Sequence, residues 1–497
     1  MYENLVKTFL IITLLFHLPV LATAKTEKDA TKAEKAAVKT EKKAAVNIDA
    51  GSVLTLEQCV SIALKNSPQI QIYQNRMKSA KSQVGIAKSD YSPTFGIGTG
   101  YTKPLNGNSV DSNGYSSDNG YYAVNISVQQ LLYNFGKTGA KIKSQKYNLE
   151  AAGYDLENMY IDTVYATKMA YYNVLAAKYN RDIYDQNVQM NEREYERTKA
   201  FFEEGLKSKI DLVNAEVNLS DARIQLVDAE NAYQTSLIQL NNSMYVAGAP
   251  MYNIQSTETF NFITPNTSVD LTNVSNVHDL ETLPACETGA VYKGSIERQN
   301  IIADYKFTPF GLSLDDAIKK AYADRPDIKS LSALVAAMNE SLKYAKREYF
   351  PELTGSAGYT MRDSSSYYNS GFNISAGLNI AAINPFRTKC DIDYAHTQVD
   401  LAQNNLDLLK QNVYFEVQSA FVNMQQIEKR IPLLGTKVKQ AQENYELADG
   451  RYEVGLGNFL ELQDAKNSYN AAQLGFVNAV FEYNTARVQV EKAMGDK

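Results

Sequence analysis

The sequence has few of the residues on which catalytic and metal sites depend, with three histidines, three cysteines and no tryptophan among 497 residues. His17, His278 and His396 are far apart in the sequence, so no two of them have the spacing of a metal site. The glycine-rich run at residues 96–100 lies in a predicted strand and lacks the spacing of a phosphate-binding loop. We therefore predict no enzyme activity, no cofactor and no bound metal.

The shortage of glycine and proline, and of excess positive charge, excludes further classes of protein. The 26 glycines and 12 prolines are too few for a collagen-like or disordered chain. The net charge is −6, whereas a nucleic-acid backbone attracts clustered lysine and arginine. We therefore expect no nucleic acid as a partner.

The three cysteines, Cys59, Cys286 and Cys390, leave at least one thiol unpaired within the chain. One possibility is a disulfide between Cys59 and Cys286 in an oxidising compartment. The other is that all three are buried thiols, which behave as small apolar side chains.

Long apolar runs are also missing after the N-terminus. Residues 1–24 are typical of a secretory signal peptide, with Lys7, a short apolar core and small residues at the end, although a membrane anchor is an alternative. Residues 25–53 form a leader rich in lysine and alanine that we expect to be flexible. Because no later stretch approaches 18 apolar residues, any membrane crossing would need a closed β-barrel.

The remaining chain contains two copies of one unit. A stretch that begins at Leu54 is matched at Leu312, and aligned proline, glycine and aromatic positions continue the match. The first repeat covers 54–245 and the second 312–497, joined by an inter-repeat segment at 246–311. Each repeat reads as a short helix, a second helix, two strands, one very long helix, a glycine-containing turn and a last helix.

Two strands are predicted in each repeat, at about 92–103 and 120–132 in the first and at about 351–362 and 368–381 in the second. Apolar and polar residues alternate along them, and aromatic residues gather near their ends, as in the strands of outer-membrane barrels. A soluble sheet that lies on a core is the alternative, because it would bury the same face. The alternation is clearest at Tyr122, Val124, Ile126 and Val128, and at Phe372, Ile374, Ala376, Leu378 and Ile380.

Four strands cannot close a barrel with an interior, so the chain must share strands with other copies of itself, and three copies provide twelve. The long helices predicted at 136–203 and 387–452 would each span about 100 Å. In each repeat the two shorter helices together match the long one in length, as the wall of a uniform cylinder requires. Apolar residues three or four apart in the last helices, from Leu219 to Leu240 and from Tyr469 to Val490, indicate coiled-coil seams.

The turn after each long helix carries the motif Tyr-x6-[Phe/Tyr]-x2-Gly-Leu-x4-[Asp/Glu]-Leu-x2-Ala, at Tyr195–Ala215 and at Tyr445–Ala465. With paired strands before each copy, the chain resembles the TolC-type outer-membrane efflux protein family. The resemblance implies a mixed α and β membrane protein, in which a trimeric 12-stranded β-barrel with four strands per chain continues into a long α-helical coiled-coil barrel.

A protein of this kind is a passive exit duct in the outer membrane of a Gram-negative-type envelope, with a large periplasmic part. Its partners would be two further copies of the chain, outer-membrane lipid, a periplasmic membrane-fusion adaptor and an inner-membrane transporter. It would serve a tripartite efflux or type I secretion system, and the inter-repeat segment would lie at an equatorial collar.

The resemblance also implies where such a duct closes. Glu461 and Asp464 fall on the aperture acids of the family and would form two rings of carboxylates in a trimer, although a solvated helix face is the alternative. Asp211 would meet Tyr452 in a latch between helices. The chain departs from the family pattern because Gly457 occupies the position of the latch arginine.

Two further acids, Glu194 and Asp449, are placed to join this latch, which indicates a weaker or differently wired closure. Gly205 with Leu206, and Gly455 with Leu456, form the turns at which the adaptor would dock. The alternatives to a duct are a trimeric outer-membrane adhesin, whose strands would occur once at the C-terminus, and a structural coiled-coil scaffold.

Overall fold

The computed structural model describes residues 51–103, 120–248, 252–256, 309–364, 367–379 and 384–496. The expected signal peptide, the leader up to residue 50, most of the inter-repeat segment, and Cys286 with its possible disulfide lie outside the described residues. Cys59 is buried but Cys390 is exposed, so the expectation that all three cysteines are buried is wrong.

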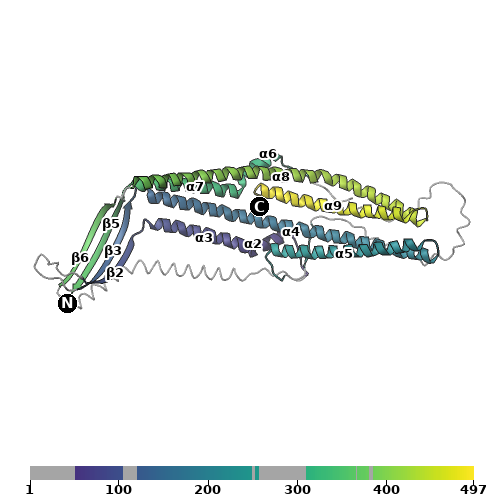
Figure 1. Ribbon diagram of the computed structural model, residues 1–497, viewed down its shortest axis with the longest axis horizontal. Coiled ribbons are helices and arrows are strands. Elements are labelled where there is room, and N and C mark those ends of the chain that lie inside the picture. Colours follow the sequence, from purple (N-terminus) through teal and green to yellow (C-terminus); the bar gives the residue numbers. More distant parts are fainter. Residues whose placement is uncertain are drawn as a thin grey trace.

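The molecule is a long bundle of helices with a small sheet at one end (Figure 1). Its two longest helices, α4 (Lys137–Glu203) and α8 (Pro385–Glu453), have 67 and 69 residues, and α8 continues through Pro432. No helix in the described part of the chain is both long and apolar enough to cross a membrane. The remaining elements of the bundle are α2 (Leu56–Asn66), α3 (Pro68–Ser89), α5 (Lys209–Ser243), α6 (Leu314–Asp324), α7 (Pro326–Lys346), the 3-10 turn η3 (Arg347–Tyr349) and α9 (Phe459–Ala493).

The helices form one curved layer in which α4 lies between neighbours along its whole length. In the half next to the sheet, the lateral order is α3, α4, α7, α8, and in the distal half it is α5, α4, α9, α8. Within the described residues, the layer therefore has α3 and α5 at one edge and α8 at the other.

The sheet continues this order, with four antiparallel strands arranged β2, β3, β5, β6. The register pairs Ile97 with Ile126, Ile126 with Tyr359, and Tyr359 with Phe372, so the apolar side chains of all four strands share one face. The strands are β2 (Thr94–Thr102), β3 (Tyr121–Tyr133), β5 (Glu352–Ser364) and β6 (Tyr367–Asn379), and a separate parallel pair joins β1 (Val53–Leu54) to β4 (Asn253–Ile254).

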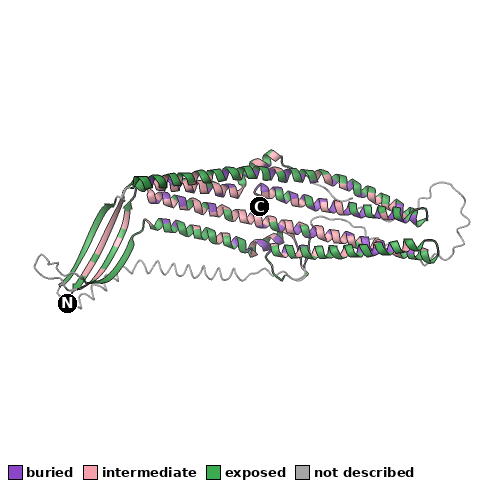
Figure 2. Ribbon diagram, viewed as in Figure 1, coloured by how far each residue is buried: buried purple, intermediate pink, exposed green. Residues whose placement is uncertain are grey.

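The apolar face of this sheet is open to solvent in the single chain. Ile97 is 79 % exposed and Ile374 is 77 % exposed. The outer strands β2 and β6 are the most exposed part of the sheet (Figure 2). Within the described residues, each of these strands is paired on one side only.

The main core lies in the middle of the bundle, where Tyr171, Leu175, Met424 and Phe476 are buried against one another. The seam between α8 and α9 is apolar: the members of its predicted stripe are all buried, from Tyr469 through Phe476 to Val490. A second stripe on α8 repeats every seven residues but has no partner within the described chain. It consists of Tyr394, Leu401, Leu408, Phe415 and Val422, all exposed.

Candidate functional site

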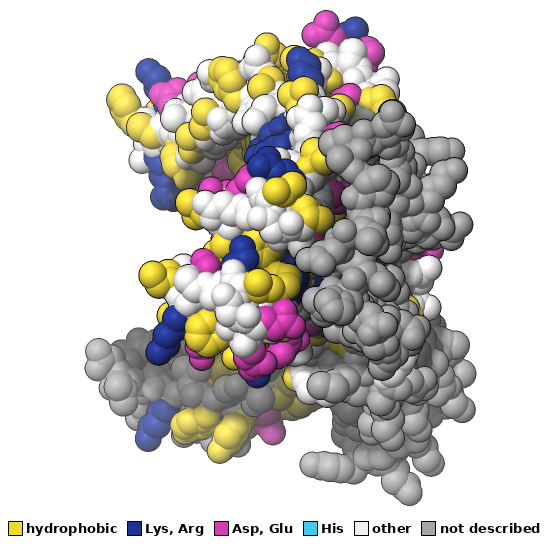
Figure 3. All heavy atoms as spheres, turned by 90° about the vertical axis from the view of Figure 1, so that its right-hand side faces the viewer, with side chains coloured by type: hydrophobic (Ala, Val, Ile, Leu, Met, Phe, Trp, Pro, Cys, Tyr) yellow, Lys and Arg dark blue, Asp and Glu magenta, His cyan; other side chains and the backbone are white. Residues whose placement is uncertain are grey.

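The distal end of the bundle is formed by two equivalent helix turns, between α4 and α5 and between α8 and α9. Gly205 and Gly455 follow the long helices with φ of 75° and 74°, a conformation that glycine adopts without strain. The next amides, of Leu206 and Leu456, donate to carbonyls five residues back at 2.8 and 2.9 Å, which closes each helix end. Both leucine side chains are exposed. Charged side chains of both signs are visible on this end of the molecule (Figure 3).

Gly457, which stands where the resemblance led us to expect a latch arginine, is tightly packed in the second turn. A Cβ at this position would lie 2.7 Å from the backbone nitrogen of Tyr452. The amide of Gly457 donates to the carbonyl of Arg451 at 2.8 Å, so the chain passes directly against the end of α8. Any larger residue would have to displace this turn.

The two proposed aperture acids lie exposed in the first turns of α9. Glu461 accepts a hydrogen bond from the Arg451 guanidinium at 3.1 Å, and the pair is mostly in solvent. Asp464 is also exposed. Such a surface ion pair contributes about 0–1 kcal/mol, so Arg451 can release Glu461 readily. The sequence prediction did not include Arg451.

The expected contact between Asp211 and Tyr452 is not among the hydrogen bonds of the described residues. Asp211 instead caps its own helix α5, and its carboxylate accepts from the Ser208 amide and hydroxyl at 3.3 and 2.8 Å. Tyr452 is fully buried, with its hydroxyl 3.4 Å from the hydroxyl of Thr198. Burial raises the pKa of Tyr452, and the negative charges of Glu194 and Asp211 add to this effect.

Arg197 on α4 supplies the cation that the sequence prediction lacked. Its guanidinium donates to Asp449 on α8 at 2.8 Å, pairs closely with Glu194 and lies 5.0 Å from the centre of the Tyr452 ring. Burial lowers the pKa of Arg197, but the two carboxylates more than compensate and hold it above its ordinary value. Arg197 lies three residues after Glu194, a helical spacing that could have identified the pair.

Next to Arg197, the distal part of the seam between α4 and α9 is polar. Lys466 on α9 is 2 % exposed, and its ammonium donates to the side-chain oxygen of Asn191 at 2.6 Å. Asn187 accepts from Asn191 at 3.0 Å and from Asn470 at 2.5 Å. Burial lowers the pKa of Lys466 to about 8. The sequence contains no signal for this seam beyond polar residues in an apolar stripe.

The four charges of this region sum to zero, because the two cations, Arg197 and Lys466, are matched by two carboxylates, Glu194 and Asp449. Burial raises the pKa of Glu194, and Arg197 opposes this effect. We name Glu194, Arg197, Asp449 and Lys466 the tip cluster. It joins three helices, α4, α8 and α9, next to the two turns.

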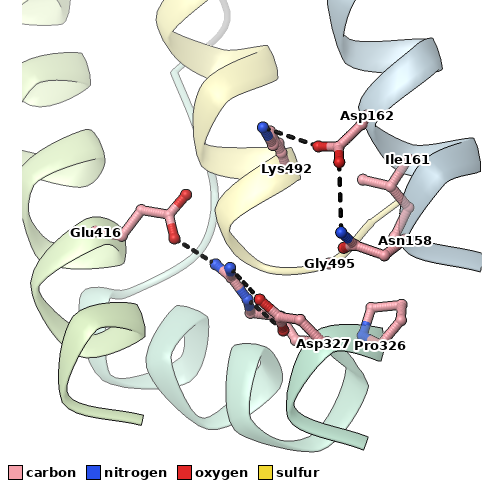
Figure 4. Close-up of a pocket in the computed structure, with 9 residues that line it drawn as sticks. Asn158, Ile161, Asp162, Pro326, Asp327, Glu416, Lys492 and Gly495 are labelled. Atoms are coloured by element: carbon pink, nitrogen blue, oxygen red, sulfur yellow. Dashed lines mark hydrogen bonds and ion pairs between the residues drawn. The ribbon is translucent and has the colours of Figure 1, made fainter. Parts of the chain in front are cut away.

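A second polar site lies midway along the bundle, around a small pocket of about 210 Å³ (Figure 4). Arg325 donates to Asp327 and to Glu416, each at 2.7 Å, and to the backbone oxygen of Ala493 at 3.0 Å. Lys492 pairs with Asp162 at 2.9 Å across the same pocket. These paired charges tie α4, α7, α8 and α9 together. Across the described ranges, no group of three or more His, Cys, Asp or Glu residues could hold a metal.

Comparison with known proteins places these features among outer-membrane channels. The family model described as "Outer membrane efflux protein" matches residues 59–244 and 317–496. The probable efflux pump outer membrane protein TtgC of Pseudomonas putida is 22% identical over 452 residues, which cover 88% of this chain and 82% of that protein. The outer membrane protein TolC of Vibrio cholerae is 26% identical over 165 residues, or 33% of this chain and 38% of that protein.

Solved structures show the same fold at low identity. The CmeC outer membrane channel of Campylobacter jejuni gives a TM-score of 0.70 at 18% identity and covers 88% of this chain and 85% of that one. The outer membrane protein VceC of Vibrio cholerae gives 0.68 at 16% identity, over 89% of this chain and 96% of that one. The chain therefore has the mixed α and β fold of these channels.

Proposed function

The chain belongs to the outer membrane efflux protein family, and from this membership we propose that it is a passive exit duct in the outer membrane. The duct serves a tripartite efflux or type I secretion system, and a periplasmic adaptor and an inner-membrane transporter open it. The protein does no chemistry on its cargo, and the transporter supplies the energy.

The observation that carries this proposal is that, in the described part of the chain, the sheet and the helical layer have matching free edges. Strand β6 and helix α8 lie at one edge, and strand β2 with helices α3 and α5 lies at the other. In a ring of copies, β6 would pair with β2 of the next copy, and the exposed stripe on α8, which lies in the half next to the sheet, would meet α3. In the distal half, the exposed apolar residues Ile210, Val217 and Ile224 on α5 would face the exposed Leu433 and Leu447 on α8 of the next copy.

We propose three copies, since three copies supply twelve strands and a barrel with an interior needs at least about eight. The exposed apolar face of the sheet would then contact outer-membrane lipid, and the helices would extend into the periplasm. The turns at Gly205–Leu206 and Gly455–Leu456 would be the far end of the duct, where the exposed leucines offer an adaptor an apolar contact.

We further propose that the duct closes at this far end. Glu461 and Asp464 would form rings of carboxylates around the axis, and the tip cluster would hold α4, α8 and α9 together. Tyr452 would support the closure from beneath the cluster, and Asp211 would fix the first turn of α5. These contacts differ from the expected latch, because the cation is Arg197 on α4 and not an arginine at position 457 in the turn.

The aperture assignment predicts a block by multivalent cations. In planar bilayers, we expect the assembled protein to show low conductance, which trivalent cations added on the periplasmic side reduce further. The double variant Glu461→Ala/Asp464→Ala should lose this block, because six carboxylates would leave the constriction.

The matched control is Asp228→Ala/Glu230→Ala, which removes two exposed acids well along α5. This control should keep the block. A block of unchanged strength in the Glu461→Ala/Asp464→Ala variant would disprove the aperture assignment.

The contribution of Tyr452 and Asp211 to closure predicts a smaller effect. Tyr452→Phe removes the hydroxyl that faces Thr198, and Asp211→Ala removes the Asp211 half of the capping box with Ser208, which contributes up to about 1 kcal/mol. We expect each variant to raise the open population of single channels up to about fivefold. Unchanged conductance in both variants would count against a role of these residues in closure.

A further inference from the structure

The helices that enter and leave the sheet share one arrangement of side chains. Where α3 leads into β2, Lys88 precedes Tyr91, and where α7 leads into β5, Lys346 precedes Tyr349. In both cases the aromatic residue lies nearer the strand and the cation lies about one helical turn further away.

The junction at the other edge repeats this order in the opposite chain direction. After β6, Phe386 comes first, and Arg387 and Lys389 follow in the first turn of α8. Phe386 is 82 % exposed, and the side chain of Arg387 is 80 % exposed. The aromatic residue is thus again nearer the sheet than the cations.

These cations are available for an external partner. Lys88, Lys346 and Lys389 are exposed, and none has an ion-pair partner within the described part of the chain. Among the described ion pairs, Arg387 has only a long contact of 3.8 Å with Asp391. The fourth junction differs, because Lys137 at the start of α4 pairs with Glu348 and Glu352 at 3.2 and 3.3 Å and serves the internal structure.

The charge of this zone is opposite to that of the whole chain. The segments 78–93, 134–147, 340–352 and 384–393 contain twelve lysines and arginines but six acids, whereas the chain as a whole carries −6. An aromatic residue at the sheet end with a cation beyond it matches the order of layers at a membrane surface, where aromatic rings lie at the headgroup level and lysine or arginine meets anionic headgroups.

We propose that Lys88, Tyr91, Lys346, Tyr349, Phe386, Arg387 and Lys389 form a junction belt that binds anionic phospholipid headgroups on the periplasmic surface of the outer membrane. The inference rests on the proposed placement of the sheet in that membrane. Aromatic residues alone would bind zwitterionic and anionic lipids alike. The cations add a preference for anionic headgroups and hold the duct at a defined depth, with the helical layer directly beneath the membrane.

The test measures lipid binding to the assembled, detergent-solubilised protein by native mass spectrometry. Phosphatidylglycerol and phosphatidylcholine with identical acyl chains are titrated separately, at low and at high ionic strength. The test variant is K88Q/K346Q/R387Q/K389Q. The control variant is K199Q/K209Q/K437Q/K439Q, which removes four exposed lysines in the distal half of the bundle.

One cation near an anionic surface changes binding by about fivefold, so we expect the unaltered protein to prefer phosphatidylglycerol at least tenfold. Salt should weaken this preference, because it screens exposed charges. The control variant should keep the preference, and the test variant should lose most of it. The double variant R387Q/K389Q, which changes only exposed side chains, should show an intermediate loss.

Equal affinity for the two lipids in the unaltered protein, or an unchanged preference in the test variant, would overturn the inference. An equal loss in the control variant would also overturn it, because the attraction would then not be local. Conductance in planar bilayers separates this failure from that of the duct. A protein that conducts without lipid preference keeps the proposed function and loses the belt, whereas a protein that never inserts loses both.

Discussion

Replacing Arg197 with methionine is expected to open the distal end of the duct. The substitution keeps an unbranched apolar stem but removes the only cation that contacts both Glu194 and Asp449 among the described ion pairs. Breaking a buried ion pair costs about 3–5 kcal/mol, because one charge is left buried without a partner. Since the Asp449 side chain is 37 % exposed, water recovers part of this cost.

We expect about 2 kcal/mol of destabilisation of the closed tip, or an increase of about thirtyfold in the ratio of open to closed channels. Single-channel recording in planar bilayers measures this ratio directly. The matched control is Arg223→Met, which removes the cation of an exposed pair with Glu192 on neighbouring helices. The control should behave as the unaltered protein. Equal open populations in Arg197→Met and Arg223→Met would show that the tip cluster does not hold the duct closed.

Replacing Lys466 with methionine is expected to abolish a dependence of closure on pH. Burial lowers the pKa of Lys466 to about 8 in the closed tip, and exposure to water on opening would return it towards 10.5. Below pH 8, lysine is charged in both forms, and the closed form bears the cost of a buried ion. Between about pH 8 and 10.5 the closed form loses this proton first, so closure becomes more favourable as the pH rises, by up to about 3 kcal/mol.

The other groups around Lys466 do not account for a pH dependence between about pH 8 and 10. Glu194 and Asp449 attract the ammonium and Arg197 repels it, but burial is the main cause of the shift. Burial raises the pKa of the nearby tyrosines Tyr445 and Tyr469, the latter to about 12, so both remain protonated. We therefore expect the open population of the unaltered protein to fall between pH 8 and 10, and that of Lys466→Met to stay level.

Lys437→Met serves as the control, because it removes an exposed lysine of the same helical half. It should keep the pH profile of the unaltered protein. A profile in Lys466→Met that still falls between pH 8 and 10 would assign the dependence to another group, and the role of Lys466 would then be rejected.

Local pattern in the sequence was sufficient for the elements of this fold. The alternation around Ile126 and Ile374 located two strands and their apolar faces, because side chains on a strand alternate between two sides. The long stretches without a break predicted α4 and α8 to within a few residues of their observed ends. The glycines Gly205 and Gly455 marked the turns, since few other residues adopt a positive φ at a helix end.

The site was predicted less well, because its contacts join helices that are distant in the sequence. Glu194 and Asp449 were identified, but the cation between them was not, since Arg197 on α4 meets Asp449 on α8 only in the folded structure, 252 positions apart in the sequence. Asp211 was expected to bind Tyr452, but its carboxylate is bonded instead to Ser208 in a local capping box. Lys466 was missed because nothing in its neighbourhood along the chain indicates burial.

The repeat, the order of helices and strands, and the apolar face of the sheet were determined by the sequence alone, because each depends on periodicity or on residues a few positions apart. The contacts of the site and the edges of the layer were decided by the lateral order of the helices in the folded chain. It placed Arg197 between two acids, buried Lys466 against Asn191 and, among the described residues, left β2, β6 and α8 with free edges. Such facts depend on how faces of distant segments meet, and a one-dimensional pattern does not contain that information.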